Sequence, residues 1–536
     1  MIAMCAMAVF GMSVNTAAQP VIDPDFTPAM GPFGFTTQGL GASPSYGEPS
    51  LRLANDGQHA IVCTPGSDDQ GNGGVQYWYS ANDGNNWNHS ISSYPGGGGD
   101  CGLDILPNGR ILDADLAITE SGINYSDDWG ATWSSGSPAG TEQDRQWLAH
   151  SDDGSIQYLV YHDFVVEGEF ISHSTDGGQT WTTSAPSQYF VNSVDQVSAL
   201  PILLGGHAGS SASIFDQGVN TFSGPLLVQG NDMYVVYSIS DVESNLNPQQ
   251  GIPPYGPVRA LVVAHSNQGG LTGTWTNVLA DVATIQGVDE SVEGTMFPWG
   301  FLDPAGNVYV VFASTRDDPS LQHFHEYYVV STDKGMTWSD PVRLDDLENS
   351  TGSTAYAAGA AVSPGVIDIA WYQAPDGTVA DDTGVWTPHF AQVTGAAGAS
   401  PQITRQAITT VPNHAGGICL QGILCGFAPG SSDRSLLDFF QLEVNPVTHK
   451  ALIAYADNFR LGVNDNGDKI GEVVVARETG TAPAPPPAAP EVVTQLPDTS
   501  AFAPAGQGLL LVAAGLLAPP LLMAGVRRRR KPRSPS

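Results

Sequence analysis

Acidic and arginine side chains stand next to each other in three predicted loops of a chain that is poor in charge. The pairs are Asp144-Arg145, Arg316-Asp317 and Asp433-Arg434, whereas charged residues make up only 14% of the 536 residues. An arginine fork binds a carboxylate through two parallel hydrogen bonds, and a carboxyl group can donate or accept a proton. These pairs therefore indicate a site for a carboxylate-bearing ligand. The alternative is that each arginine binds a neighbouring aspartate and only ties the fold together.

One short pattern recurs four times and indicates how such residues are positioned. Its copies are residues 80–87, 126–133, 174–181 and 331–338, and a degenerate fifth copy spans residues 266–275. The second, third and fourth copies match Ser-x-Asp-x-Gly-x-Thr-Trp in full. In such a turn the Ser and Asp side chains bind backbone, the Gly allows a positive φ, and the Trp packs in an apolar layer. We expect these aspartates to be structural, because a catalytic acid is not needed four times.

A longer unit surrounds these turns and repeats seven times. Each unit has an apolar strand, a turn rich in Asp, Asn, Gly or Pro, and a second apolar strand. The strand pairs are expected at residues 50–64, 102–115, 146–163, 224–240, 296–314, 355–373 and 436–458. Units six and seven lack the recurring turn, and only a third strand is expected there, near residues 389–393 and 473–476. Seven units predict an all-β, seven-bladed β-propeller with four-stranded blades, with six blades as the alternative.

The recurring turn resembles the Asp-box, or BNR repeat, of sialidase-like β-propellers. The resemblance covers roughly residues 45–478. It implies a ligand site on the face built by the loops that precede each first strand and follow each second strand, with the Asp-box turns on the opposite face. Sialidases have six blades and carry Arg-Ile-Pro at the first strand, but residues 46–51 of this chain have no arginine before the proline. This difference argues against an exo-sialidase.

The resemblance also implies roles for residues on that face. Sialidases bind the sialic acid carboxylate with three arginines, and they use a Tyr/Glu pair as nucleophile and an Asp as acid/base. Arg145, Arg316 and Arg434 would supply the arginines. The catalytic candidates are Asp144, Glu290 (or Glu293) and Tyr372. Further ligand contacts are expected from His162, Asp163 and Arg460, and the same loops carry Glu48, Asp113, Asp115, Asp317 and Asp457.

The net charge of −35 argues against nucleic acid and anionic lipid as partners. Cys63 ends the second strand of unit one and Cys101 begins unit two, so we expect a disulfide between them, and another between Cys419 and Cys425. No cofactor and no cysteine metal site are expected. Residues 464–468 form an Asn/Asp/Gly-rich segment that is followed by Glu472. This segment is interpreted as a plain turn, with a calcium site as the open alternative.

Both ends of the chain look like targeting segments. Residues 1–18 resemble a signal peptide, residues 19–44 form a lead-in to the propeller, and residues 479–495 are a Pro/Ala-rich spacer. Residues 496–536 then resemble a Gram-positive sorting signal, with Leu-Pro-Asp-Thr-Ser at 496–500, an apolar run at 509–526 and a basic tail. Ser500 replaces the usual Gly of that signal. If the signal is cleaved, the protein is expected to be attached to the cell wall. If it is not cleaved, the apolar run is expected to anchor the protein in the plasma membrane, and in both cases the propeller is extracellular.

These features predict a surface-anchored propeller that recognises glycans or glycoproteins. An exo-acting glycoside hydrolase of sialidase type is the first alternative, because the ligand face carries carboxyl groups and arginines. A platform for a protein partner, without chemistry, is the second alternative.

Overall fold

The chain forms β-strands throughout the part that the computed structural model describes. That part comprises residues 29, 31–67, 73–92, 94–117, 120–141, 143–163, 168–182, 189–190, 219–242, 255–282, 297–381, 383–420, 433–465 and 467–480. No helix occurs in these ranges, and hence none that is long and apolar enough to cross a membrane. They belong to the first of two units of the chain, Met1–Pro485. The predicted signal peptide and sorting signal lie outside the described residues.

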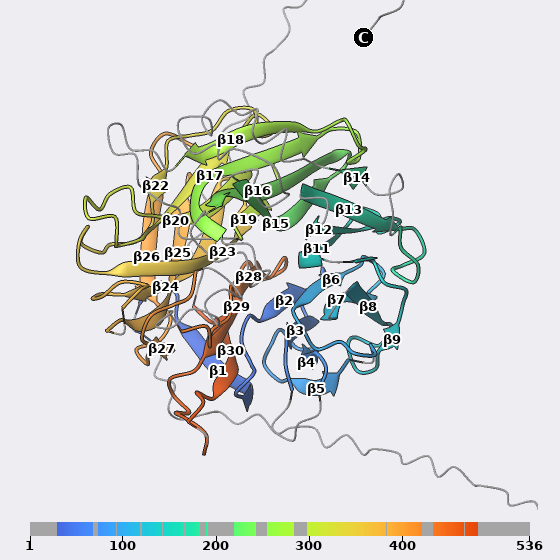
Figure 1. Cartoon of the computed structure of the whole chain (residues 1–536), viewed down its shortest axis with the longest axis horizontal. Coiled ribbons are helices and arrows are strands. Elements are labelled where there is room, and N and C mark those ends of the chain that lie inside the picture. Colours follow the sequence, from blue (N-terminus) through green and yellow to red (C-terminus); the bar gives the residue numbers. More distant parts are fainter. Residues whose placement is uncertain are drawn as a thin grey trace, which may run out of the picture. The chain divides into compact units, whose positions relative to one another are not determined.

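Seven antiparallel sheets form a seven-bladed β-propeller (Figure 1). Blade one is β2 (Ser50–Leu53), β3 (Ala60–Thr64), β4 (Gln76–Ser80) and β5 (Asn88–Ile91). Blade two is β6 (Cys101–Ile105), β7 (Ile111–Ala117) and β8 (Glu120–Ser126), with β9 (Ser134–Ser135) and β10 (Gly140–Thr141) both pairing with β8. Blade three is β11 (Gln143–His150), β12 (Gln157–Asp163), β13 (Gly168–Ser174) and β14 (Tyr189–Phe190). Blade four is β15 (Val219–Gln229), β16 (Asp232–Val242), β17 (Tyr255–Ser266) and β18 (Thr276–Val282).

The remaining three blades follow the same order. Blade five is β19 (Trp299–Leu302), β20 (Val308–Ser314), β21 (His325–Ser331) and β22 (Val342–Arg343). Blade six is β23 (Ser353–Ser363), β24 (Val366–Ala374), β25 (Val385–Thr394) and β26 (Gln402–Ala407), and β27 (His414–Ala415) pairs with β25. Blade seven is β28 (Gln441–Val444), β29 (Ala451–Asp457), β30 (Gly471–Glu478) and β1 (Phe35–Ser43). The prediction of seven blades is confirmed.

The first strands of successive blades contact one another and close a ring. The contacts run from β2 through β6, β11, β15, β19, β23 and β28 back to β2. The second strands are covered on both sides by neighbouring blades, so every residue of β20 and β24 is buried. These strands are rich in β-branched and aromatic residues, which suit a pleated surface packed on both faces.

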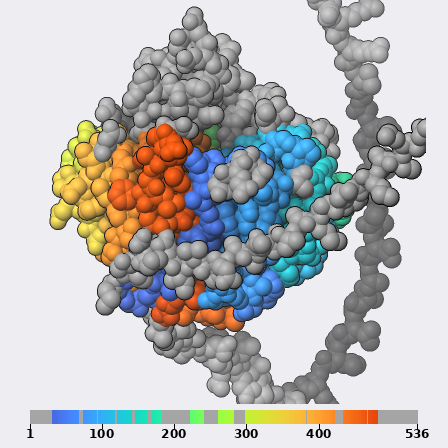
Figure 2. Space-filling model, turned by 90° about the horizontal axis from the view of Figure 1, so that it is seen from below, coloured from blue at the N-terminus to red at the C-terminus, as the bar shows by residue number. Residues whose placement is uncertain are grey.

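The two ends of the described chain meet in blade seven. Strand β1 pairs with β30 from Phe35 opposite Glu478 to Ser43 opposite Gly471. Figure 2 shows the blue N-terminal and red C-terminal segments side by side. The expected lead-in at residues 19–44 therefore contains the outer strand of the last blade, and the propeller begins at Phe35 rather than near residue 45. Sequence reasoning also found no fourth strand for blade six, where the structure has β26.

The recurring turns join the third and fourth strands of blades one to five. In the three full copies the Oδ1 atom of Asp128, Asp176 or Asp333 accepts the backbone N–H of the Thr four residues later, at 2.8–2.9 Å. The Oδ2 atom accepts the hydroxyl of the same Thr, at 2.6–2.7 Å. These aspartates therefore serve the turn, as expected from their repetition.

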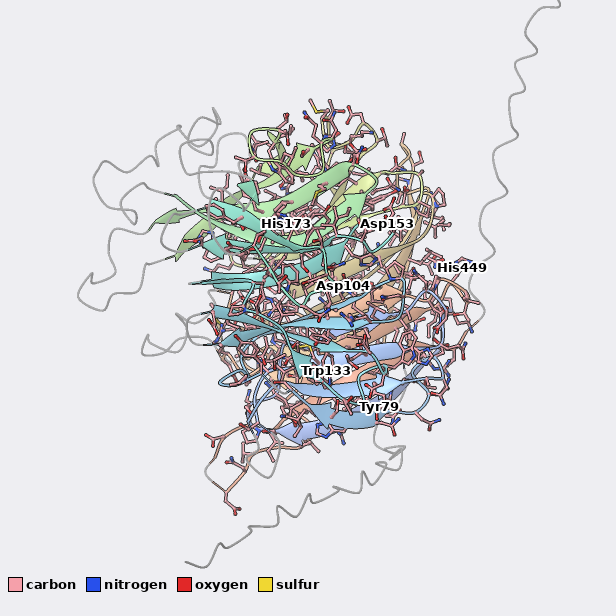
Figure 3. All side chains as sticks on the ribbon, turned by 90° about the vertical axis from the view of Figure 1, so that its right-hand side faces the viewer. Tyr79, Asp104, Trp133, Asp153, His173 and His449 are labelled. Atoms are coloured by element: carbon pink, nitrogen blue, oxygen red, sulfur yellow. A yellow bond between two sulfur atoms is a disulfide. The ribbon has the colours of Figure 1, made fainter. Side chains whose placement is uncertain are left out.

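The propeller has two unlike faces. We call the face with the recurring turns and the first-to-second-strand turns the turn face, on which His449 of the β28–β29 turn lies at the right in Figure 3. We call the opposite face, built by the loops that precede first strands and follow second strands, the loop face. The predicted disulfide joins Cys63 to Cys101 on the loop side of blades one and two. Cys419 is disulfide-bonded as well, but its expected partner Cys425 lies outside the described residues.

Candidate functional site

Glu48 lies on the loop face, in the loop that leads into β2. Its φ of 51° is unfavourable for a residue with a side chain, and its N–H donates to the Leu436 carbonyl of blade seven at 3.3 Å. The side chain is 0% exposed, and no donor among the described residues hydrogen-bonds to either carboxyl oxygen. Burial raises the pKa of Glu48 well above its ordinary value, and the nearby Asp100 and Asp438 carboxylates add to this effect. Glu48 therefore holds its proton to a higher pH than an exposed glutamate does.

Arg145 lies beside Glu48, in a β-bulge at the start of β11. The register between β11 and β12 shifts between Gln143 and Gln146, and such a bulge redirects the side chain it carries. The Arg145 Nη1 atom is 3.6 Å from the Glu48 Oε1 atom and 3.7 Å from the Asp100 Oδ2 atom. These distances are too long for hydrogen bonds but short enough for strong attraction in a buried place.

Two aromatic rings hold the Arg145 guanidinium. Its central carbon is 4.7 Å from the Trp147 ring centroid and 4.0 Å from the Phe439 ring centroid. The Nη2 atom donates to the Cys101 carbonyl at 3.0 Å. The Nε and Nη1 atoms meet no hydrogen-bond acceptor among the described residues, although the residue is 1% exposed. This guanidinium is thus fixed in place with donors left for a ligand.

Arg434 and Asp438 complete the group from the loop that precedes β28. The Arg434 Nη1 atom donates to the Asp438 Oδ1 atom at 2.7 Å. The Asp438 pKa is raised, because burial outweighs the opposing effect of Arg434. The side chains of Asp100 and Arg434 are 21% and 26% exposed, whereas those of Glu48 and Arg145 are 0% exposed. We call these five residues the Glu48 cluster, and solvent reaches it at Asp100 and Arg434.

A pair of aspartates on β7 lies next to this cluster. Asp113 and Asp115 are both 0% exposed, and the Asn124 Nδ2 atom lies 3.3 Å and 3.4 Å from their Oδ2 atoms. Asp113 also accepts the Tyr77 hydroxyl at 2.6 Å. Burial is the largest cause of the raised pKa of Asp115, which is about 6, and burial also raises the pKa of Asp113. Arg145 is close enough to lower the Asp113 pKa in part.

The Glu48 cluster combines three carboxyl groups with two guanidinium groups. When Glu48 carries a proton, the two remaining carboxylates balance the two arginines. The cluster can then accept hydroxyl hydrogens at its carboxylates, donate to hydroxyl or carboxylate oxygens from its arginines, and supply one proton.

No family model and no curated protein matches this sequence. Solved structures match in architecture at low identity. A protein of unknown function from Dyadobacter fermentans has 12% identity and a TM-score of 0.41, with 83% of this chain and 98% of that chain covered. The α-L-arabinanase of Penicillium chrysogenum has 14% identity and a TM-score of 0.38, with coverages of 70% and 92%. An ulvan lyase of polysaccharide lyase family 25 has 10% identity and a TM-score of 0.44, with coverages of 81% and 95%. These values are too low to carry a residue's role to this chain.

Several predicted site residues serve other contacts. Tyr372 is 1% exposed, its hydroxyl accepts the Ala456 N–H at 3.1 Å, and burial raises its pKa, so its geometry suits a tie between blades rather than a nucleophile. His162 is buried in blade three with its Nδ1 atom 3.2 Å from the Glu169 Oε1 atom, and its ring also contacts Phe222 of blade four. Asp163 ends β12 and is half-buried.

The three predicted arginines do not gather at one point. Arg145 and Arg434 both belong to the Glu48 cluster. Arg316 pairs instead with Asp281 and lies over the rings of Phe312 and Tyr327, which belong to blade five. Arg460 pairs with Glu472 across the β29–β30 connection.

Other candidates cannot be placed or are already satisfied. The Asp144 side chain, Glu290 and Glu293 lie outside the described residues. In the turn considered for calcium, Asn464 and Asp468 hydrogen-bond to each other, and Glu472 pairs with Arg460, which favours the plain turn. One group among the described residues has metal-ligand spacing, Cys63, Cys101 and Asp113, but its two sulfurs form the disulfide.

Sequence reasoning missed two parts of the loop face. Asp100 was overlooked, although it directly precedes Cys101, which the expected disulfide had already placed there. In blade five, Arg343 contacts His325 and Asp345 at 2.7 Å and 2.9 Å, beside the fully buried Glu326. The sequence could have indicated this group, because His325 and Glu326 begin a strand whose next residues are mostly apolar.

Proposed function

We propose that this protein is an extracellular, surface-anchored propeller that binds carbohydrate at the Glu48 cluster. The observation that carries the proposal is the buried Arg145 guanidinium, whose Nε and Nη1 atoms have no hydrogen-bond partner among the described residues, beside the equally unpartnered carboxyl group of Glu48. Both lie next to a rim of Asp100 and Arg434 that solvent reaches. Buried polar groups without partners are costly, and they are retained where they serve a ligand.

The chemistry of the cluster suits a sugar. A sugar ring offers neighbouring hydroxyl groups that both donate and accept, and planar carboxylate and guanidinium groups bind such pairs through two parallel hydrogen bonds. An acidic sugar would in addition place its carboxylate near Arg145 and Arg434. Arg145 and Arg434 are the two cations of the cluster, and a guanidinium group pairs with a carboxylate through charge-assisted hydrogen bonds.

Hydrolysis of a glycosidic bond is the second candidate, and the raised pKa of Glu48 favours it. Glycosidases pair a protonated carboxylic acid with an ionised carboxylate at roughly 5 to 10 Å, depending on whether they retain or invert. Glu48 has the environment of the acid, and Asp100 is a half-buried carboxylate of the same cluster that solvent reaches.

The test compares the full-length protein with three variants on a labelled glycan library. Binding is measured with the library immobilised as an array, and released sugar is measured by mass spectrometry. Arg434→Gln should weaken binding at least tenfold, because it removes the guanidinium at the rim. Arg316→Gln is the matched control, since it removes one arginine from the same face, and it should leave binding unchanged. Equal effects of the two substitutions, or no glycan bound by the parent protein, would contradict the proposal.

Glu48→Gln separates binding from catalysis. Glutamine has the shape of a protonated glutamate but cannot release a proton, so the variant should fold and still bind sugar. Sugar release by the parent protein that disappears in this variant would establish a hydrolase. Binding without release in the parent protein would establish a recognition module, and a protein-partner platform would show neither.

Surface anchoring is proposed from the terminal segments alone. If residues 496–500 are a sorting signal, the protein released from a cell wall by muramidase should end at Thr499. An intact C-terminus in the membrane fraction would instead support a membrane-anchored protein.

A further inference from the structure

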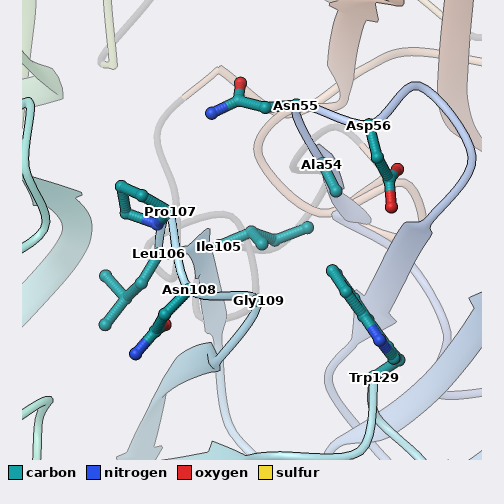
Figure 4. Close-up of a pocket in the computed structure, with 9 residues that line it drawn as sticks. All are labelled: Ala54, Asn55, Asp56, Ile105, Leu106, Pro107, Asn108, Gly109 and Trp129. Atoms are coloured by element: carbon teal, nitrogen blue, oxygen red, sulfur yellow. The ribbon is translucent and has the colours of Figure 1, made fainter.

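A pocket of about 220 Å³ lies on the turn face, away from the Glu48 cluster. The β2–β3 turn, the β6–β7 turn and the recurring turn of blade two meet there (Figure 4). Its apolar walls include Ile105, Pro107 and Trp129, and its polar side chains include Asn55 and Asn108. The volume is below the roughly 300–1,000 Å³ typical of sites for drug-sized ligands, so it suits one ring of a larger molecule.

Trp129 is an unusual residue for its place in the turn. The fourth residue of each recurring turn, directly before the Gly of the pattern, has a left-handed backbone. The five copies have Asp83, Trp129, Gly177, Gly269 and Lys334 at this position, with φ between 57° and 73°. A bulky side chain is disfavoured at positive φ. The backbone conformation of the turn therefore gives no reason for a tryptophan at position 129. Residues with strained backbones of this kind concentrate at functional sites.

The Trp129 ring is held rigidly. The His59 ring stacks on it with centroids 3.8 Å apart and an interplanar angle of 8°. The His59 Nδ1 atom is in turn 2.6 Å from the Asp56 Oδ2 atom. Figure 4 shows the indole standing across the pocket from Pro107 and Asn108. The β6–β7 turn can approach the Trp129 indole this closely only with glycine at position 109, because a Cβ atom there would lie 2.9 Å from the indole. A preformed aromatic wall costs little ordering on binding.

Hydrogen-bonding groups stand at the rim of the same pocket. Asn55 is exposed and makes no side-chain hydrogen bond to the described residues. Asn108 uses its Oδ1 atom for the Arg110 N–H, at 3.1 Å, and its amide N–H groups point to no acceptor in the described part of the chain. Burial raises the pKa of Asp56, but backbone hydrogen bonds from His59 and Gln58 outweigh this effect and keep its pKa below the ordinary value.

We infer that this pocket is a carbohydrate subsite that binds one neutral sugar ring of a glycan. The apolar C–H face of a sugar packs on an aromatic ring, and its edge hydroxyl groups match the two amides and the Asp56 carboxylate. The Asp56 charge and the net charge of −35 disfavour an anionic sugar. The role proposed for this subsite is binding alone, and it does not depend on the function proposed for the Glu48 cluster.

The test uses saturation-transfer NMR and titration with short neutral oligosaccharides of glucose, galactose, mannose or xylose. The full-length protein carries Arg434→Gln, so that binding at the Glu48 cluster is weakened and the two sites are distinguished. Trp129→Gly should weaken binding at least tenfold while the protein stays folded, because glycine suits the left-handed backbone. Trp129→Phe should recover part of the affinity.

Lys334→Gly is the matched control, since it makes the same change at the same turn position in blade five. It should leave oligosaccharide binding unchanged. The inference is overturned if no oligosaccharide of the panel binds, if Trp129→Gly binds as well as its parent, or if Lys334→Gly weakens binding to the same degree. Thermal unfolding of each variant, followed by circular dichroism, verifies that the fold is intact.

Discussion

Replacing Asp457 by Asn should change how the stability of the propeller depends on pH. Asp457 ends β29 on the loop face and is 2% exposed. Burial raises its pKa from 3.8 to about 6, against hydrogen bonds from the backbone N–H groups of Arg460 and Phe459 to Oδ1, each 3.0 Å long. Asparagine keeps the Oδ1 acceptor for both N–H groups but cannot ionise, so the substitution isolates the charge.

The magnitude follows from linkage between proton binding and folding. A rise in pKa from 3.8 to about 6 corresponds to about 3 kcal/mol, at about 1.4 kcal/mol for each pH unit. The folded protein binds the proton more tightly than the unfolded chain, so this stability is fully present below pH 3.8 and is lost as the pH rises through 6. Between pH 8 and pH 5 the parent protein should gain about 1.4 kcal/mol from this group, and Asp457→Asn should lack that gain.

Urea denaturation of the two proteins at several pH values between 5 and 8 measures the difference. Asp381→Asn is a suitable control, because hydrogen bonds from Thr383 lower the Asp381 pKa to about 2. Its stabilising effect is lost only as the pH falls below about 4, so the control should follow the parent protein between pH 5 and pH 8. A difference between Asp457→Asn and the parent that stays constant over this range would refute the reasoning.

Three further substitutions test what holds the propeller together. The Cys63→Ala/Cys101→Ala double variant should lose about 4 kcal/mol of unfolding free energy in urea, because the disulfide closes a 38-residue loop; a loss below 1 kcal/mol would contradict this account. Asp176→Ala should lose about 1 kcal/mol with glycan binding unchanged, and a specific loss of sugar activity would show that this turn aspartate is not merely structural. Phe35→Ala should cost about 3 kcal/mol and expose β1 to proteases, since the Phe35 and Phe390 ring centroids are 5.2 Å apart at the closure of blade seven; unchanged proteolysis would argue against a closing role.

The architecture was predictable because its signals are local. Two apolar runs around a short turn indicate each strand pair. Five of the seven blades also contain a recurring turn, whose hydrogen bonds join residues two to four positions apart. Strand β1 gave no such signal. Its Phe-Thr-Thr-Gln-Gly-Leu-Gly-Ala-Ser sequence is rich in small residues, has a bulge between Gly39 and Gly41, and pairs with residues more than 400 positions away. Only closure of the ring makes this segment a strand.

The site was predictable only in part, because its residues come from loops on different blades. The sequence placed Arg145 and Arg434 on the correct face, since a loop's position before a first strand decides its face. It could not tell that Arg316 would pair with Asp281, because that choice depends on side chains packed between blades four and five. Nor could the sequence single out Glu48 among the acidic residues of the loop face. Its importance comes from its burial and from the lack of hydrogen-bond partners for its carboxyl group among the described residues.

The aspartates of the recurring turns differ in pKa from the buried carboxyl groups at and beside the Glu48 cluster, and this difference bears on function. On the turn face, Asp128 and Asp176 have lowered pKa values, because hydrogen bonds within the turn outweigh burial. On the loop face, Glu48 and Asp113 have raised pKa values, because burial outweighs their partners. A carboxylate that only needs to hold a turn is best kept ionised, whereas a carboxyl group that keeps its proton lowers the stability of the fold as the pH rises. Retaining such groups together is costly for folding alone. For this reason proton-dependent chemistry is expected at the Glu48 cluster rather than at the aspartates of the recurring turns.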